Sequence, residues 1–242
     1  MDEQPLLQHL MELRRRLIRI LSGFFLLFIG LFHWSGAIYH MLAKPLLDRL
    51  PSSAQMIAID VTAPFFVPMK VTMLLAFLLS LPHTLYQVWA FVAPGLYRHE
   101  RRLILPLVIS SVVLFFVGMA FAYFLVFPVV FSFMSAVTPQ GVSMMTDIDK
   151  YFSFVMGMFI AFGVTFEVPV AVVVLTYIGV VSIASLREAR PYVIVGAFII
   201  AAIVTPPDVL SQVLLAIPLW LLYEIGIGVA ALLVRPSRPV VI

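Results

Sequence analysis

The sequence predicts an all-α polytopic membrane protein. Of its 242 residues, 63% are hydrophobic and only 11% are charged, whereas a soluble domain has roughly 45–50% apolar and 25% charged residues. The mean hydropathy is +1.11, and the apolar residues gather in six stretches. A protein core cannot bury such an excess, but lipid can cover it. We find no soluble domain or internal repeat, so we expect residues 1–242 to form a single transmembrane domain.

Six transmembrane spans are expected, because about 20 helical residues cross a hydrocarbon core of ~30 Å. They cover residues 17–38, 70–88, 103–127, 152–178, 192–204 and 209–234. The last two are expected to be short: the fifth would span roughly 20 Å at 1.5 Å per residue, and Glu224 interrupts the sixth after Tyr223. The turn Thr205-Pro206-Pro207-Asp208 between them predicts a short helical hairpin.

Positive charge predicts the orientation, since Lys and Arg concentrate on the cytoplasmic side. Eleven arginines fall on one side of the six spans: Arg14, Arg15, Arg16, Arg19, Arg98, Arg101, Arg102, Arg187, Arg190, Arg235 and Arg238. Four cations fall on the other: Lys44, Arg49, Lys70 and Lys150. Both termini are therefore expected in the cytoplasm.

Two segments outside the spans have features of their own. Leu6, Leu10 and Leu13 in residues 5–16 recur at helical spacing with Leu17 just beyond, and Glu12 lies off this stripe. This pattern predicts a short amphipathic helix over residues 5–16 at the cytoplasmic interface. Apolar residues extend past the length of a signal-peptide core, so we expect an uncleaved first span. Residues 39–69 contain four prolines and are long enough to have structure of their own. We expect this loop to cap the outer face.

Glu167 is the only charged residue between Lys150 and Arg187, near the middle of an apolar stretch. A carboxyl at that depth costs a few kcal/mol unless it is protonated, paired or wetted, and such residues usually have functions. Pro169 predicts a kink, and Gly163, one turn earlier, would leave room for a polar partner or water. A protonated Glu bonded to a neighbouring helix is the structural alternative.

Two further polar clusters are candidates for binding. Glu12 and Glu100 are acids on a face dominated by arginine, so they either pair with those arginines or receive guanidinium groups from a partner. Trp89 and Tyr97 fit an interfacial aromatic belt. In the hairpin, Asp208 is placed to cap the last helix, and Gln212 one turn on should face protein or water.

Composition and motifs argue against chemistry that needs a metal or a catalytic group. The chain has no Cys, and its five His are scattered, so we expect no metal site. We recognise no phosphate-binding loop or nucleophile elbow. We expect no enzyme activity, no cofactor and no nucleic-acid partner.

In order along nearly the whole chain, several motifs point to one family. They are His9-Leu10-x-Glu12-Leu13-Arg14-x-Arg16, Gln87-x-Trp89-x-Phe91-x-x-Pro94-x-Leu96-x-x-x-Glu100-Arg101, Phe162-Gly163-x-x-Phe166-Glu167-x-Pro169, Arg187-x-x-Arg190-x-Tyr192, Pro206-Pro207-Asp208 through Gln212, and Ala216-Ile217-Pro218 before Glu224-Ile225. With these motifs the chain resembles the TatC family, the signal-receptor subunits of the twin-arginine protein translocase. The resemblance implies six helices in a concave, glove-like arrangement in the bacterial inner membrane.

The resemblance also implies roles for individual residues. Glu12 and Glu100 would bind the arginine pair of the export signal of a folded cargo, with Arg14, Phe91 and Leu96 shaping that site. Glu167 would face the concave groove, and Thr205 with Gln212 would dock the single-helix partners TatB and TatA. Pro45 and Asp208 would belong to outer-side elements needed for activity. The chain departs from many members where Phe65-Phe66 follow Pro64 in place of an acid.

The resemblance further implies a homo-oligomer in a complex of TatB and TatC type. Because no motif indicates hydrolytic chemistry, we expect the proton gradient to supply the energy. The alternative from the residues alone is a proton-coupled secondary transporter of a small solute, with Glu167 as the proton carrier. An intramembrane enzyme would have only Glu167 and Asp208 as acids within the bilayer, at different depths.

Overall fold

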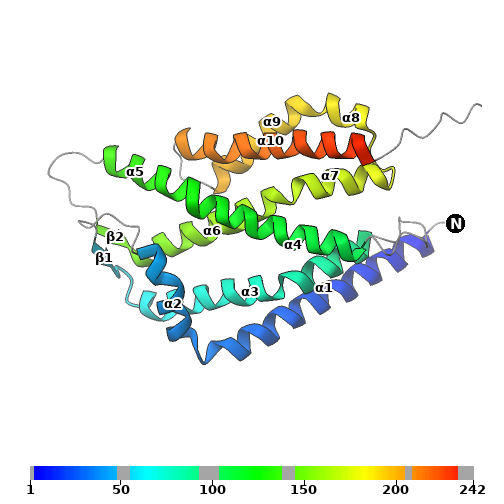
Figure 1. Ribbon diagram of the computed structural model, residues 1–242. Coiled ribbons are helices and arrows are strands. Elements are labelled where there is room, and N and C mark those ends of the chain that lie inside the picture. The colour runs from blue at the N-terminus through cyan, green and yellow to red at the C-terminus, as the bar shows by residue number, and fades with distance from the viewer. Residues whose placement is uncertain (1–2, 48–54, 93–103, 138–144, 205–208, 234–242) are drawn as a thin grey trace, which may run out of the picture. The chain divides into compact units, whose positions relative to one another are not determined.

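The structure is a computed structural model that describes residues 3–47, 55–92, 104–137, 145–204 and 209–233 (Figure 1). Almost all of these residues are helical. The helices are α1 (Glu3–Phe32), α2 (Ser35–Leu47), α3 (Ala63–Val92), α4 (Ile104–Phe121), α5 (Phe127–Val137), α6 (Ile148–Phe166), α7 (Val168–Tyr177), α8 (Ile183–Glu188), α9 (Arg190–Val204) and α10 (Val209–Leu233). A π-helical turn, Ala122–Val126, joins α4 to α5, and two short strands are β1 (Gln55–Ile57) and β2 (Met145–Asp147).

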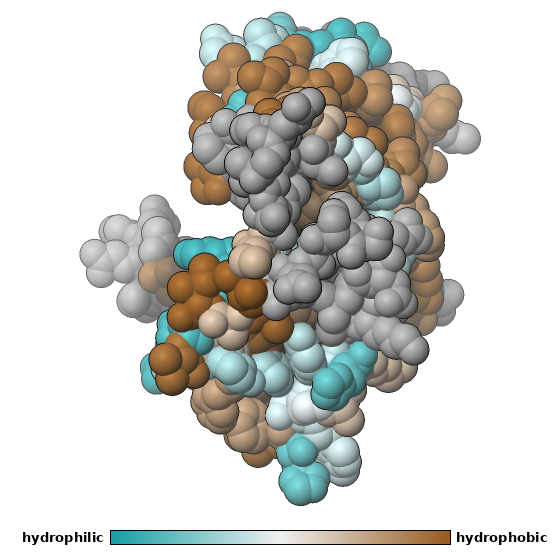
Figure 2. Space-filling model, turned by 90° about the vertical axis from the view of Figure 1, so that its left-hand side faces the viewer, coloured by the Kyte–Doolittle hydropathy of each residue, from teal (hydrophilic) through white to brown (hydrophobic). Residues whose placement is uncertain are grey.

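The predicted class, a polytopic membrane protein built of helices, is confirmed. Four helical stretches in the described residues are long and apolar enough to cross a membrane: Ala63–Phe91, Leu105–Met134, Ile148–Tyr177 and Val209–Leu233. The bent pair Leu10–Phe32 and Ser35–Met41 makes five if it counts as one span, and Arg190–Ile203 is a shorter apolar helix. Large apolar side chains cover much of the surface, as the brown areas of Figure 2 show. The count of six spans stays a prediction.

Two compact units make up the chain, and each is described by itself. Unit 1 comprises Met1–Val112 and Phe127–Gly157; unit 2 comprises Val113–Val126 and Met158–Ile242.

In unit 1, α1 packs along α3 (Figure 1). From residue 10 to residue 31, the half-buried positions of α1 recur every three or four residues: Glu12, Arg16, Ile20, Gly23, Phe24, Leu27, Phe28 and Leu31. Such spacing forms one face of a helix. Gly23 permits the contact, because a Cβ there would lie 3.1 Å from the ring of His83. The Nε2 atom of His83 lies 3.3 Å from the Arg19 carbonyl oxygen.

The N-terminal segment differs from its prediction in two ways. Residues 5–16 are not a separate interfacial helix, because α1 continues from Glu3 to Phe32 without a break. Leu10, Leu13 and Leu17 are exposed, so the leucine stripe points away from α3. The span expected at 17–38 is interrupted after Phe32, where the chain bends by 90° into α2.

The segment expected to be a cap loop, residues 39–69, contains secondary structure. It includes most of α2, all of β1 and the first turns of α3, which begins at Ala63, before the expected start at Lys70. Strand β1 pairs in parallel with β2, with Met56 opposite Thr146. Nearby in the chain, the Lys70 ammonium lies 2.6 Å from Oδ1 of Asp149. This ion pair joins α3 to the first turn of α6.

In unit 2, glycines let helices approach closely. A Cβ on Gly118 of α4 would lie 2.5 Å from the Phe162 carbonyl oxygen of α6, and one on Gly163 would lie 2.4 Å from the Phe115 ring. On α10, a Cβ on Gly226 would lie 3.0 Å from the Cα of Pro169. Small residues at helix contacts are typical of membrane proteins, where close packing replaces the hydrophobic effect.

Helices α7, α8, α9 and α10 form the other part of unit 2 around a buried cluster: Val172, Leu186, Tyr223, Ile227 and Ala230. Tyr223 donates its hydroxyl to the Leu186 carbonyl at 2.8 Å. Helix α9, with 15 residues, is short as predicted, whereas α10 runs for 25 residues. The expected interruption at Glu224 does not occur: α10 continues to Leu233, and Arg190 of α9 pairs with the Glu224 carboxylate at 2.6 Å.

The Gly118 contact generates a stability prediction. Gly118→Ala places a methyl group against a backbone carbonyl that cannot rotate away, so we expect about 1–3 kcal/mol of destabilisation. The melting temperature in detergent should fall by several degrees. Gly228→Ala is the matched control, because nothing lies within 4 Å of its Cβ position. That variant should be neutral or gain up to about 1 kcal/mol from helix propensity; equal melting temperatures for the two variants would contradict the packing argument.

Candidate functional site

The described site residues come from four helices. Glu12 and Arg14 lie on α1, Phe91 lies near the end of α3, and Gln212 lies in the first turn of α10. Glu167 separates α6 from α7. Pro45 lies in α2. The remaining predicted site residues lie outside the described residues: Leu96, Glu100, Thr205 and Asp208.

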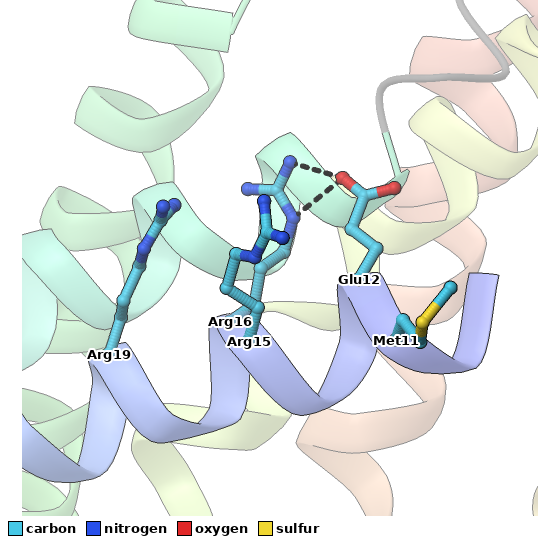
Figure 3. Close-up of a pocket in the computed structure, with 5 residues that line it drawn as sticks. All are labelled: Met11, Glu12, Arg15, Arg16 and Arg19. Carbon is cyan, nitrogen blue, oxygen red and sulfur yellow. Dashed lines mark hydrogen bonds and ion pairs between the residues drawn. The ribbon is translucent and has the colours of Figure 1, made fainter. Parts of the chain in front are cut away.

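Glu12 is held by a guanidinium of its own helix (Figure 3). Arg16, one turn further along α1, donates from Nη2 to Oε1 of Glu12 at 2.6 Å and from Nε to the same oxygen at 3.0 Å. Arg16 also donates from Nη1 to Oε1 of Gln87 in α3 at 3.3 Å. The second oxygen of Glu12 accepts no hydrogen bond from a described residue. The three side chains thus form a chain of contacts from α3 to Glu12, referred to below as the Gln87–Arg16–Glu12 relay.

A cavity of ≈ 330 Å³ opens beside this relay. Its described lining residues are Met11, Glu12, Arg15, Arg16 and Arg19, and Figure 3 shows them along one stretch of α1. Its size suits a side chain or a short peptide segment. Three guanidinium groups face one carboxylate there, so the described lining is positively charged overall. Arg14 is exposed, and neither Arg14 nor Phe91 lines the cavity.

The relay contains two residues to which the sequence assigned no role. Arg16 could have been found from its i,i+4 spacing to Glu12, the ordinary distance for an ion pair along a helix. Gln87 could have been found because an amide in an apolar stretch is expected to face protein. What joins them is the packing of α1 on α3, which no local pattern predicts.

Trp89 is not an interfacial anchor as predicted, but a buried residue in unit 1. Its side chain is only 9% exposed, and its Nε1–H donates to the Ser111 hydroxyl of α4 at 2.9 Å. Ser111 is itself fully buried. The hydrogen bond joins α3 to α4 two residues beyond Gln87. It therefore helps to position the end of α3 that carries Gln87 and Phe91.

Glu167 lies where the sequence predicts a kink. Helix α6 ends at Phe166 and α7 begins at Val168, with Pro169 in its first turn. Both carboxylate oxygens of Glu167 are inaccessible to solvent. The expectation for Gly163 is wrong, because the Phe115 ring fills the space beside this glycine. Gly163 therefore serves helix packing and leaves no room for water at that point.

Gln212 is half-buried in α10, next to the fully buried Ser211. Among the described residues, no group of three or more His, Cys, Asp or Glu side chains could hold a metal ion.

Comparison with known proteins gives one consistent result. The sequence model of the family described as "Sec-independent protein translocase protein (TatC)" matches residues 8–218. The chain is 52% identical over 237 residues to the Sec-independent protein translocase protein TatC of Escherichia coli (strain K12), covering 98% of this chain and 92% of that protein. It is 38% identical over 238 residues to the protein of the same name from Aquifex aeolicus (strain VF5), covering 98% of each.

A solved structure agrees with these relatives. The crystal structure described as "Twin Arginine Translocase Receptor- TatC" superposes with a TM-score of 0.82 at 39% identity, covering 93% of this chain and 98% of that one.

The Trp89–Ser111 hydrogen bond generates a second stability prediction. Trp89→Phe removes the indole N–H donor and leaves the buried Ser111 hydroxyl without this hydrogen bond. The change should lower the free energy of unfolding by about 1–3 kcal/mol. Adding Ser111→Ala removes that hydroxyl. The double variant should therefore lose less melting temperature than the sum of the losses of the two single variants. A double-mutant cycle on melting temperatures in detergent measures this coupling. Strictly additive losses would show that the hydrogen bond contributes nothing.

Proposed function

The chain belongs to the TatC family of Sec-independent protein translocase proteins, and from that premise we propose that it is the receptor component of a twin-arginine translocase. It binds the twin-arginine signal peptides of folded cargo at its cytoplasmic face and recruits TatB and TatA for export. It is a multi-pass protein of the bacterial inner membrane with both termini in the cytoplasm. It works within a homo-oligomeric complex of TatB and TatC type, and the proton gradient supplies the energy.

The observation that carries the proposal is the state of Glu12. Its carboxylate already binds one guanidinium by two N–H groups on a single oxygen, beside a cavity of ≈ 330 Å³. The geometry therefore suits guanidinium recognition, and the second oxygen, which accepts no hydrogen bond from a described residue, is the proposed acceptor for an arginine of the signal. A carboxylate binds the planar, forked guanidinium more specifically than the ammonium of Lys. Glu100 supplies the second carboxylate. Arg14, Phe91 and Leu96 shape the signal site, Arg14 and Phe91 from outside the described cavity lining.

The other predicted residues act after recognition. The apolar segment of the signal lies along the groove near Glu167, and Thr205 with Gln212 docks TatB and TatA. The half-buried position of Gln212 supports a role in protein contact, since an amide facing lipid is costly. Pro45 and Asp208 contribute outer-side elements. The alternative of a small-solute transporter has no support from the related proteins, and it gives Glu12 no function.

Removing the charge of Glu12 tests the receptor site. Glu12→Gln keeps the shape of the side chain but loses the charge-assisted hydrogen bonds to a guanidinium, so crosslinking of a twin-arginine signal peptide should fall about tenfold. Crosslinking in membranes, normalised to the amount of protein, is the measurement. The matched control is Glu188→Gln, an exposed carboxylate on α8, which should leave crosslinking unchanged. Equal crosslinking by both variants would refute the site.

The short helix α9 generates a separate prediction. Its 15 residues span about 22 Å, so they thin the bilayer near the proposed docking residues or need shielding. Inserting seven apolar residues into α9 adds about 10 Å and should reduce transport severalfold while signal binding persists. Adding the same residues after Ile242 is the control. Normal export with the lengthened α9 would show that local thinning has no part in transport.

A further inference from the structure

The Gln87–Arg16–Glu12 relay places a charged group inside a helix contact. Glu12 and Arg16 continue the half-buried face by which α1 packs on α3. The Arg16 side chain is only 18% exposed, and Gln87, its partner on α3, is 5% exposed. A buried amide oxygen and a half-buried guanidinium that hydrogen-bond each other are costly to separate, because each would lose its partner without gaining water. Arg16 is therefore expected to keep its place when a ligand arrives.

The relay also fixes which part of Glu12 is presented. Both hydrogen bonds from Arg16 end on Oε1, and in Figure 3 the other carboxylate oxygen points away from Arg16. An unrestrained glutamate would rotate about its side-chain torsions and lose that freedom on binding. A carboxylate held at one oxygen has already lost much of this torsional freedom. Its second oxygen is therefore preorganised as an acceptor.

We infer that Arg16 and Gln87 are positioning residues for signal recognition: Gln87 anchors Arg16 to α3, and Arg16 aims the second carboxylate oxygen of Glu12 at an arginine of the signal. The inference rests on the proposed function of Glu12 and adds to it a source of specificity. A guanidinium makes a two-N–H fork on one oxygen, as Arg16 itself does, and therefore needs that oxygen in a fixed direction. An ammonium acts as a point charge and needs the direction much less.

Simple electrostatics predicts the opposite effect of removing Arg16 on signal binding, so an experiment can distinguish the two explanations. The described cavity lining carries three arginines and one glutamate, and a twin-arginine signal is also cationic. If charge alone mattered, removing any of these arginines would strengthen signal binding. Arg15 and Arg16 are neighbours in the chain and line the same cavity. The described hydrogen bonds to Glu12 come from Arg16, so Arg15→Gln is the matched control.

The experiment measures the Kd of a fluorescent signal peptide for the full-length protein in lipid nanodiscs. Two peptides are compared, one with the Arg-Arg pair and one with Lys-Lys. Arg16→Gln should raise the Kd for the Arg-Arg peptide about tenfold and change the Lys-Lys value about twofold or less, so discrimination falls. Arg15→Gln should lower the Kd for both peptides. Arg16→Gln binding the Arg-Arg peptide as tightly as Arg15→Gln does would overturn the inference.

Gln87→Leu tests the anchor. It should raise the Kd for the Arg-Arg peptide about threefold to tenfold, and the double variant with Arg16→Gln should be no worse than Arg16→Gln alone, since both break one relay. Additive losses would overturn the shared mechanism. The ratio of the two Kd values does not depend on the fraction of folded protein, so a loss of stability alone leaves it unchanged.

Glu12→Gln separates this inference from the function on which it rests. If Glu12→Gln lowers affinity while Arg16→Gln and Gln87→Leu do not, the receptor site stands and the relay is refuted. If Glu12→Gln leaves both affinities unchanged, the proposed function of Glu12 fails first.

Discussion

The cost of an unpaired charge in an apolar chain governs much of this structure. Three ion pairs among the described residues, each at 2.6 Å, reduce this cost. They are Arg16 with Glu12, Lys70 with Asp149, and Arg190 with Glu224. The pairs differ in what they join. Lys70–Asp149 connects α3 with α6 and Arg190–Glu224 connects α9 with α10, so each of these two pairs joins two different helices. Arg16–Glu12 lies within one helix and reaches α3 only through Gln87. Exposed ion pairs contribute little to stability, whereas a pair inside a helix contact restricts where its charges can point.

Close approach of backbones is the second constraint. Because lipid tails are as apolar as the side chains, the hydrophobic effect does not drive helices together, and van der Waals packing must. Gly118 and Gly163 bring α4 and α6 into contact, and Gly226 brings α10 onto α7. Gly163 shows how this constraint overrides a local interpretation. Its position one turn before Glu167 suggested a polar space, but the Phe115 ring occupies it. The sequence alone allows Gly163 either to leave a polar space or to admit a neighbouring side chain. The position of α4 determines which of the two occurs.

Several features could be predicted from the sequence because they follow from composition and period. Local patterns predict the membrane class, the break at Glu167 and the short α9. They also predict the apolar stretches that form α3, α4–α5, α6–α7 and α10. Other features depend on a partner distant in the chain. Glu224 of α10 pairs with Arg190 of α9, and the indole of the buried Trp89 donates to Ser111 of α4. Placing Glu12 required knowing that α1 packs on α3. Arg16 and Gln87 had no role assigned from the sequence, because their contact also depends on the packing of α1 on α3.

The described cavity lining beside Glu12 carries three arginines and one glutamate, so the net charge of this lining does not attract a cationic signal. Attraction must then come from a few directed acceptors whose geometry offsets the surrounding repulsion. Binding that depends on direction has a benefit that net attraction lacks, because a strongly acidic surface would bind any basic peptide with little selectivity. In the proposed site, a carboxylate oxygen with a fixed direction would disfavour ligands that supply positive charge without the planar fork of a guanidinium. In the proposed site, Arg16 would both repel a cationic ligand and orient the acceptor oxygen of Glu12, so one side chain would combine the two effects.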